Sequence, residues 1–238
     1  MKRGFLGALA AIVLAVIAWT SGGLFGFRWW SWHQELTVTV ETPEGIKTAS
    51  SISAAGWEME PEWFRLGDTG GGNGVGNLKG EAVVLELAKG RYLFVLLEGY
   101  SAELAIKVFA EPPLRKVNRH EYALALDRID EVTESRSLTV TQYPLLVTFD
   151  DISSPATVKR VDPENLAVEF GSGYRLKSIT IAITRNSVTK GKVGALLESE
   201  FFKKWGDQHH SSLADGGIDN PYFKTLASSL GRGDFIRD

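Results

Sequence analysis

Residues 35–42 read ELTVTVET, and their apolar side chains alternate with polar ones. Successive side chains of a β-strand point to opposite faces, so this pattern predicts a strand with one buried face. A turn of Pro43, Glu44 and Gly45 follows, in which proline suits the second position. The extended stretch from Ile46 to about Ala55 can pair back. The sequence therefore predicts a β-hairpin as the first folded element.

The rest of the folded region mixes strands and helices without strict alternation. Residues 92–97, YLFVLL, are apolar on both faces, which is typical of a central strand covered on both sides. Ser101 and Asn118 stand where helix caps are expected, so each predicts a covering helix. Further strands are expected at 78–87, 91–98, 143–149, 157–161 and 174–184, and further helices at 162–170 and 192–205. This order predicts an α+β fold with one mainly antiparallel sheet and packed helices.

An uncharged apolar segment precedes the hairpin. Residues 4–27 read GFLGALAAIVLAVIAWTSGGLFGF. About 20 apolar residues are enough for a helix to cross a bilayer, so the segment predicts a transmembrane helix. Lys2 and Arg3 precede it and only Arg28 follows. The positive-inside bias therefore predicts a cytoplasmic N-terminus, with the remaining chain on the other side of the membrane.

Four of the seven tryptophans, Trp19, Trp29, Trp30 and Trp32, lie near the far end of this segment. Indole rings favour the headgroup region of a bilayer. Together with Arg28, these tryptophans are the predicted membrane-interface residues.

A cleaved signal peptide is the competing interpretation of the same segment. Its apolar region would be residues 5–19, and cleavage would follow Thr20 or Gly22. Neither site has the preferred Ala-x-Ala form. A third interpretation, a buried core helix, requires a run longer than is usual for such helices. The first two interpretations both put residues 33–238 outside the cytoplasm.

Composition narrows the class of protein. The chain has 238 residues and no cysteine, which excludes disulfides, a thiol nucleophile and thiolate metal sites. An exported domain without cysteine is typical of a bacterial envelope, so we expect a periplasmic domain anchored in the inner membrane. From Arg28 onward there are 24 basic and 29 acidic residues, a net charge of −5. This balance argues against a nucleic-acid partner and against electrostatic docking on anionic lipid.

Two polar segments lack a regular pattern. Residues 67–77 read GDTGGGNGVGN, which predicts a surface loop and lacks the Gly-Lys-Ser/Thr of a phosphate-binding loop. Residues 206–238 are polar and rich in Gly and Ser, which predicts a flexible tail. The chain thus divides into a stub and anchor at 1–28, an extracytoplasmic domain at 29–205 and the tail at 206–238.

No catalytic, cofactor-binding or metal-binding residues are predicted. Asp150 and Asp151 are adjacent and would point to opposite faces of a strand, so we interpret them as part of a solvated loop. The metal-capable residues near the C-terminus lack the spacing of known sites. They are Asp207, His209, His210 and Asp215. The serines form no Gly-x-Ser-x-Gly or Ser-x-x-Lys motif.

Four stretches resemble a family of uncharacterised bacterial envelope proteins. They are LTVTVETPEG at 36–45, GEAVVLEL at 80–87, YPLLVTFDD at 143–151 and VDPENLAVEFGSGYRLKSITIAIT at 161–184. The resemblance spans about residues 30–185. It implies a bacterial source, an N-terminal hydrophobic segment and an anchored extracytoplasmic domain, and it brings no assigned activity.

The expected function is that of a single-pass, membrane-anchored binding or scaffolding protein of the bacterial envelope. Its expected partners are the bilayer, through residues 4–27, and another envelope protein. Two alternatives stay open. One is an envelope hydrolase whose site is assembled only in three dimensions, and the other is a periplasmic protein released by signal cleavage.

Overall fold

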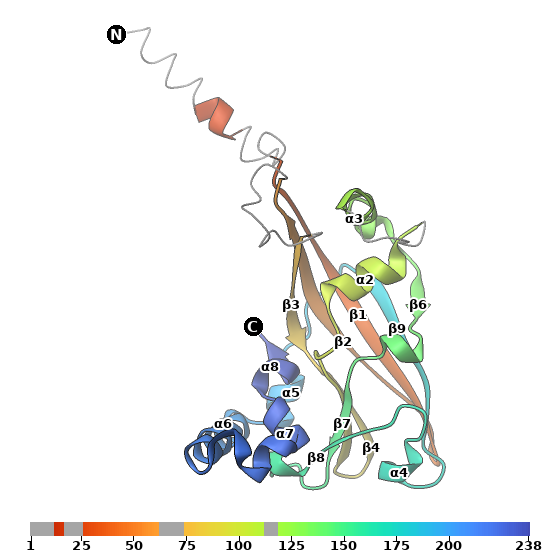
Figure 1. Ribbon diagram of the computed structural model, residues 1–238. Coiled ribbons are helices and arrows are strands. Elements are labelled where there is room, and N and C mark those ends of the chain that lie inside the picture. The colour runs from red at the N-terminus through yellow and green to blue at the C-terminus, as the bar shows by residue number, and fades with distance from the viewer. Residues whose placement is uncertain (1–11, 17–25, 62–73, 112–118) are drawn as a thin grey trace.

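Figure 1 shows the protein as a computed structural model, which describes residues 12–16, 26–61, 74–111 and 119–238. The strands are β1 (Arg28–Thr42), β2 (Gly45–Met59), β3 (Val75–Glu81), β4 (Val83–Ala88), β5 (Arg91–Val95), β6 (Ser135–Ser137), β7 (Leu146–Phe149), β8 (Val158–Arg160), β9 (Arg175–Thr184) and β10 (Ile236–Arg237). The helices are α2 (Ala102–Phe109), α3 (Arg119–Leu126), α4 (Ala167–Phe170), α5 (Lys192–Leu196), α6 (Ser199–Ala214), α7 (Leu226–Ser229) and α8 (Arg232–Phe235). The predicted α+β class is therefore confirmed.

Most of the predicted transmembrane segment, 4–27, lies outside the described residues. Within it, residues 12–16 are helical and exposed. Over the part of the chain that the structure describes, no helix is both long and apolar enough to cross a membrane.

A long hairpin of β1 and β2 is the central element. Its two strands pair at fifteen positions, from Arg28 opposite Met59 to Thr42 opposite Gly45. The predicted turn joins them, and Thr42 Oγ1 donates to Gly45 O at 2.9 Å. Even-numbered side chains from Trp32 to Thr42 are buried, so the predicted alternation is confirmed. The strand also begins seven residues before the predicted start at Glu35.

The expected single sheet is two antiparallel sheets. The first has six strands in the order β10-β3-β2-β1-β9-β6, and the second has four in the order β4-β5-β7-β8. The predicted strand at 78–87 is divided at Ala82, where the chain passes from the first sheet into the second. At this corner Ala82 N donates to Phe235 O at 2.8 Å. Apolar residues occur in both sheets, so their pattern does not show where the chain passes from one sheet to the other. The prediction of a single sheet was therefore wrong.

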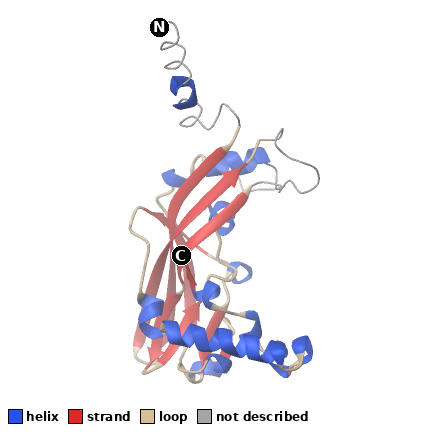
Figure 2. Ribbon diagram, turned by 90° about the vertical axis from the view of Figure 1, so that its left-hand side faces the viewer, coloured by secondary structure: helices blue, strands red, loops and turns tan. Residues whose placement is uncertain are grey.

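The second sheet is covered on both faces, as the apolar run at 92–97 predicts. Leu93 and Val95 of β5 belong to the core between the two sheets. Phe94 and Leu96 belong to a second core, which the C-terminal helices complete. In Figure 1 these helices (α5 to α8) lie on the side of β7 and β8 away from β1 and β9, and Figure 2 shows α6 running across the strands. The layers are therefore sheet, sheet and helices.

Helices α2 and α3 cover the inner face of the first sheet, not the second sheet as expected. Ser101 caps α2 as predicted, because its hydroxyl accepts from Leu104 N at 3.2 Å. In α3, Tyr122 stacks on Trp57 of β2 with ring centroids 5.5 Å apart. The upper half of the hairpin thereby gains its own apolar cover.

The C-terminal segment is ordered, so the prediction of a flexible tail over 206–238 is wrong. Phe235 is 0% exposed, and its ring lies 5.6 Å from that of Phe94 and 5.7 Å from that of Trp205. Trp205 Nε1 donates to Ala227 O at 2.8 Å. The apolar residues of this segment are few and have no helical period, so the sequence pattern predicts a polar tail. Most of them, from Tyr222 to Ile236, nevertheless pack into the second core.

Replacement of Phe235 tests this C-terminal layer. We expect Phe235→Ala to lower the free energy of unfolding by about 3–5 kcal/mol, because it leaves a cavity among four aromatic rings. Denaturant unfolding measures the change. Ile218→Ala, at an 80% exposed position in the same segment, is the control and should change stability by less than about 0.5 kcal/mol. A Phe235 variant as stable as this control would contradict the ordered layer.

Candidate functional site

A shallow depression lies on the outer face of the first sheet, the face turned away from the second sheet. His33 of β1, Ala54 of β2 and Lys79 of β3 are cross-strand neighbours there. Ala54 carries only a methyl group, so the surface dips between the two longer side chains. Gly56, the next residue of β2 on this face, has Asn77 over it, and a Cβ at Gly56 would lie 2.8 Å from Asn77 Oδ1. Ala54 therefore forms the floor of the depression, which ends where Asn77 covers Gly56.

A strap, residues 185–191, crosses this face from β9 to α5. The Nδ1 atom of His33 lies 2.6 Å from Asn186 O, so this nitrogen carries the proton and donates. Thr189 N donates to Ile52 O at 2.9 Å, and Ile52 N donates to Thr189 Oγ1 at 3.0 Å. These bonds hold the strap against β1 and β2.

The carboxylate of Glu81 fixes the far end of the strap. Its two oxygens accept from Gly191 N at 2.5 Å and from Val193 N at 3.0 Å. Glu81 is only 7% exposed, and the two amides compensate the burial of its charge. The Glu81 carboxylate therefore has a structural role, because it links β3 to the start of α5.

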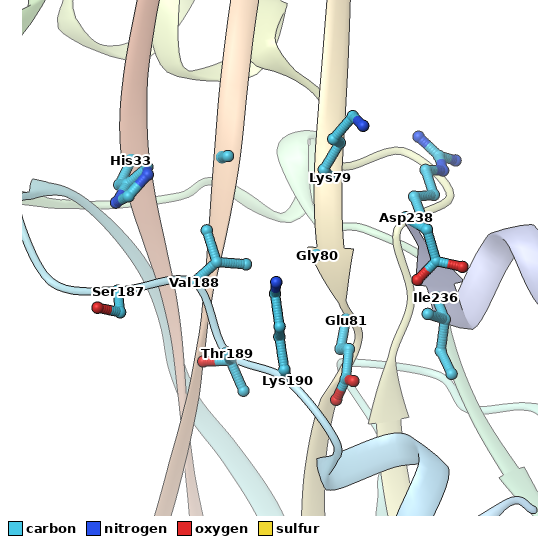
Figure 3. Close-up of a pocket in the computed structure, with 12 residues that line it drawn as sticks. His33, Lys79, Gly80, Glu81, Ser187, Val188, Thr189, Lys190, Ile236 and Asp238 are labelled. Carbon is cyan, nitrogen blue, oxygen red and sulfur yellow. The ribbon is translucent and has the colours of Figure 1, made fainter.

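The strap and the sheet enclose a groove of about 690 Å³ (Figure 3). Figure 3 shows Lys190 rising from the strap, with His33 on one side and with Lys79 and Asp238 on the other. A second cavity of about 380 Å³ also uses His33 and Ala54. Asp130, Thr184 and Arg185 line this second cavity as well.

The basic and acidic side chains around the groove differ in whether they have a bonding partner. Within the described ranges, neither Lys79 nor Lys190 forms an ion pair. The carboxylates are engaged, Glu81 by the two backbone amides and Asp238 by Arg232 at 2.8 Å. The groove therefore presents two ammonium groups with no acidic partner.

This arrangement suits binding better than acid–base chemistry. Among the described residues that line it, the groove has one imidazole, and the side-chain carboxylates of Glu81 and Asp238 are bonded to other groups. The Ser187 hydroxyl is directed away from the groove (Figure 3). Of the residues described, none form a group of three or more His, Asp or Glu able to hold a metal.

Asp207, His209, His210 and Asp215 lie on or at the end of α6, at the opposite end of the molecule from the start of β1 (Figure 1). Asp207 pairs with Lys203, and His210 Nδ1 lies 2.7 Å from Gly206 O. Asp150 and Asp151 lie in an exposed turn, as interpreted from the sequence.

The predicted interface residues have different environments. Trp19 lies outside the described residues. Trp29 is 58% exposed and stacks on Phe27, with centroids 5.9 Å apart. Trp32 is 4% exposed in the core, and its Nε1 donates to Gln34 Oε1 at 2.9 Å. Trp29 and Trp32 are three residues apart and therefore lie on opposite faces of β1. The face of Trp32 is the buried one, so the prediction of Trp32 as an interface residue was wrong.

Arg28 and Trp30 join β1 to the end of α3. Arg28 pairs with Asp127 at 2.5 Å, and Trp30 Nε1 donates to the same carboxylate oxygen at 3.0 Å. The Arg28 guanidinium also lies 4.6 Å from the centroid of the Trp30 ring. Both residues are therefore engaged within the protein.

Sequence reasoning assigned no role in a binding site to His33, Lys79 or Lys190. The available signal was weak: Ala54 and Gly56 put two small residues on the outer face of a strand. Comparisons with protein families, with characterised proteins and with solved structures give no match to this chain.

Replacement of Glu81 tests the anchoring of the strap. Glu81→Gln has one acceptor oxygen instead of two and sets an amide NH₂ against a backbone N–H. We expect the free energy of unfolding to fall by about 1–3 kcal/mol. The exposed Glu164→Gln is the charge-matched control in the same urea titration and should be close to wild type. Equal stability of the two variants would show that the Glu81 contacts contribute nothing.

The Arg28–Asp127 pair predicts a pH dependence. Burial alone would raise the pKa of Asp127, but hydrogen bonds from Arg28 and Trp30, with the Arg28 charge, hold the pKa below its usual value. The pair therefore stabilises the fold above the ordinary aspartate pKa of about 3.9, and this stability is lost as the pH falls through the lower folded-state pKa.

Asp127→Asn should lower the free energy of unfolding by about 0.5–1 kcal/mol at neutral pH, since solvent screens this half-exposed pair. The difference from wild type should narrow as the pH falls below about 4. Urea unfolding as a function of pH measures it, with the exposed Asp219→Asn as control. A difference that widens in acid would contradict the assignment.

Proposed function

We propose that this protein is a single-pass, membrane-anchored binding protein of the bacterial envelope, with its folded domain in the periplasm and the groove as its binding site. The observation that carries the proposal is the junction at the start of β1. There an uncharged apolar run, 4–27, continues without a linker into the strand that organises the fold.

The aromatic pair at this junction supports the proposal. Phe27 and Trp29 stack, and Trp29 is largely exposed on the outer face. Val75 lies on the same face, across Glu58 from Trp29, and is 69% exposed. Exposed indole and aliphatic side chains beside an apolar segment suit the boundary between membrane and water.

The hairpin also supports a role in presenting a site away from a membrane. In Figure 1 the start of β1 is at one end of the molecule, and α6 and α7 are at the other. Fifteen residues of strand span about 50 Å. The proposed anchor and the body of the domain would thus be far apart, with the groove between them.

An envelope hydrolase is the weaker alternative, because Glu81 and Asp238 in the groove are already engaged by other groups. A periplasmic protein released by signal cleavage differs from the proposal only in the fate of the N-terminal segment. The intact mass of the mature protein distinguishes these two possibilities.

The test is fractionation of cells that express the full chain. Detection should use an antibody against the domain, since a tag after Asp238 would lie at the groove. We expect the full-length mass in membranes that resist alkaline carbonate, and release into the soluble fraction when 4–27 is deleted. A mass short by about twenty residues in the periplasmic fraction would establish cleavage and refute the anchor.

A further inference from the structure

We propose that the groove binds a soluble oligoanion, a ligand that presents phosphoryl or carboxylate groups to Lys79 and Lys190. This inference rests on the binding role proposed above and names its ligand class. It concerns the outer face alone, and it holds whether or not residues 4–27 stay attached.

Within the described part of the chain, the groove carries unpaired positive charge. The chain from Arg28 onward is net negative, yet the groove holds two lysines for which the described residues supply no acidic partner. The two nearby carboxylates are satisfied by other groups, Glu81 by amides and Asp238 by Arg232. Both ammonium groups are therefore available to pair with the charged groups of an anion.

The backbone around both lysines is held in place by hydrogen bonds. Lys79 stands on a paired strand, and Lys190 lies between Thr189, which bonds twice to Ile52, and Gly191, which bonds to Glu81. The backbone of both lysines is thus fixed before a ligand arrives. Less ordering free energy is then needed on binding.

The size and shape of the groove suit a small ligand. A groove of about 690 Å³ lies within the range of about 300–1,000 Å³ typical of small-molecule sites. Ala54 leaves its floor open between His33 and Lys79. A compact anion with two or more charged groups matches these features.

The position of the groove favours a dissolved ligand over a lipid headgroup. His33 is five residues from the start of β1, which is about 16 Å along the strand. If 4–27 is the anchor, a hairpin that stands away from the membrane holds the groove above the headgroups. A lipid headgroup is therefore the competing ligand in the test.

The experiment is isothermal titration of the full chain in uncharged detergent micelles at fixed ionic strength. The probes are inorganic pyrophosphate, citrate and glycerophosphoglycerol, the free headgroup of phosphatidylglycerol. We expect saturable binding of pyrophosphate, citrate or both, weakened by added salt, and no binding of the headgroup. Which of the two binds tells phosphoryl from carboxylate ligands.

Three variants locate the site. Lys79→Gln and Lys190→Gln should each weaken binding about tenfold, because each removes one charged contact. Ala54→Leu keeps every charge but fills the floor of the groove, and it should abolish binding. Lys224→Gln removes an exposed lysine elsewhere and is the matched control, with affinity unchanged. A thermal melt of each variant confirms that the fold is retained.

Absence of saturable binding of pyrophosphate and citrate below about 10 mM would overturn the inference. So would binding that Lys79→Gln, Lys190→Gln and Ala54→Leu leave unchanged, or binding of the headgroup alone. Because the titration uses micelles, its outcome does not depend on where the chain resides in the cell. Failure of the ligand assignment and failure of the proposed anchor are therefore distinguishable.

Discussion

The fifteen antiparallel pairs between β1 and β2 set the frame for the whole molecule, because a strand with one buried face must be covered along its full length. Two groups of elements cover this face. The second sheet packs against the part of the hairpin near the turn, and α2 and α3 pack near the start of β1, where Tyr122 meets Trp57. The outer face is then the side on which the strap crosses, and the groove forms there because β2 contributes Ala54 between larger neighbours.

Glu81 connects the layers at one point. Its side chain holds the end of the strap and the start of α5, and its carbonyl accepts from Ser51 Oγ at 2.6 Å. It lies beside the corner at Ala82, where the chain passes between the sheets and β10 pairs with β3. The first sheet, the strap and the C-terminal helices therefore meet around one buried carboxylate. The groove takes its shape from the same junction that joins the layers.

Local patterns predicted the local structure well. The alternation at 35–42, the turn at Pro43 and the cap at Ser101 each depend on neighbours in the sequence, and each has the expected structure. Arrangements that depend on distant partners were not predictable. The corner at Ala82 depends on Phe235, and the burial of Trp32 depends on a strand that begins before the alternating pattern. The groove joins residues from β1, β3 and a loop near position 190, which no spacing in the sequence relates.

The direction of the long strands has a mechanical consequence. β1 is hydrogen-bonded on both sides, to β2 and to β9. A pull applied at Arg28, and resisted by the body of the domain, runs parallel to these strands. Such a load is shared at once by the hydrogen bonds along both ladders, whereas a pull across a strand would open them one after another. The domain is thus built to bear tension from its N-terminal end in shear, the direction in which a β-sheet resists rupture best.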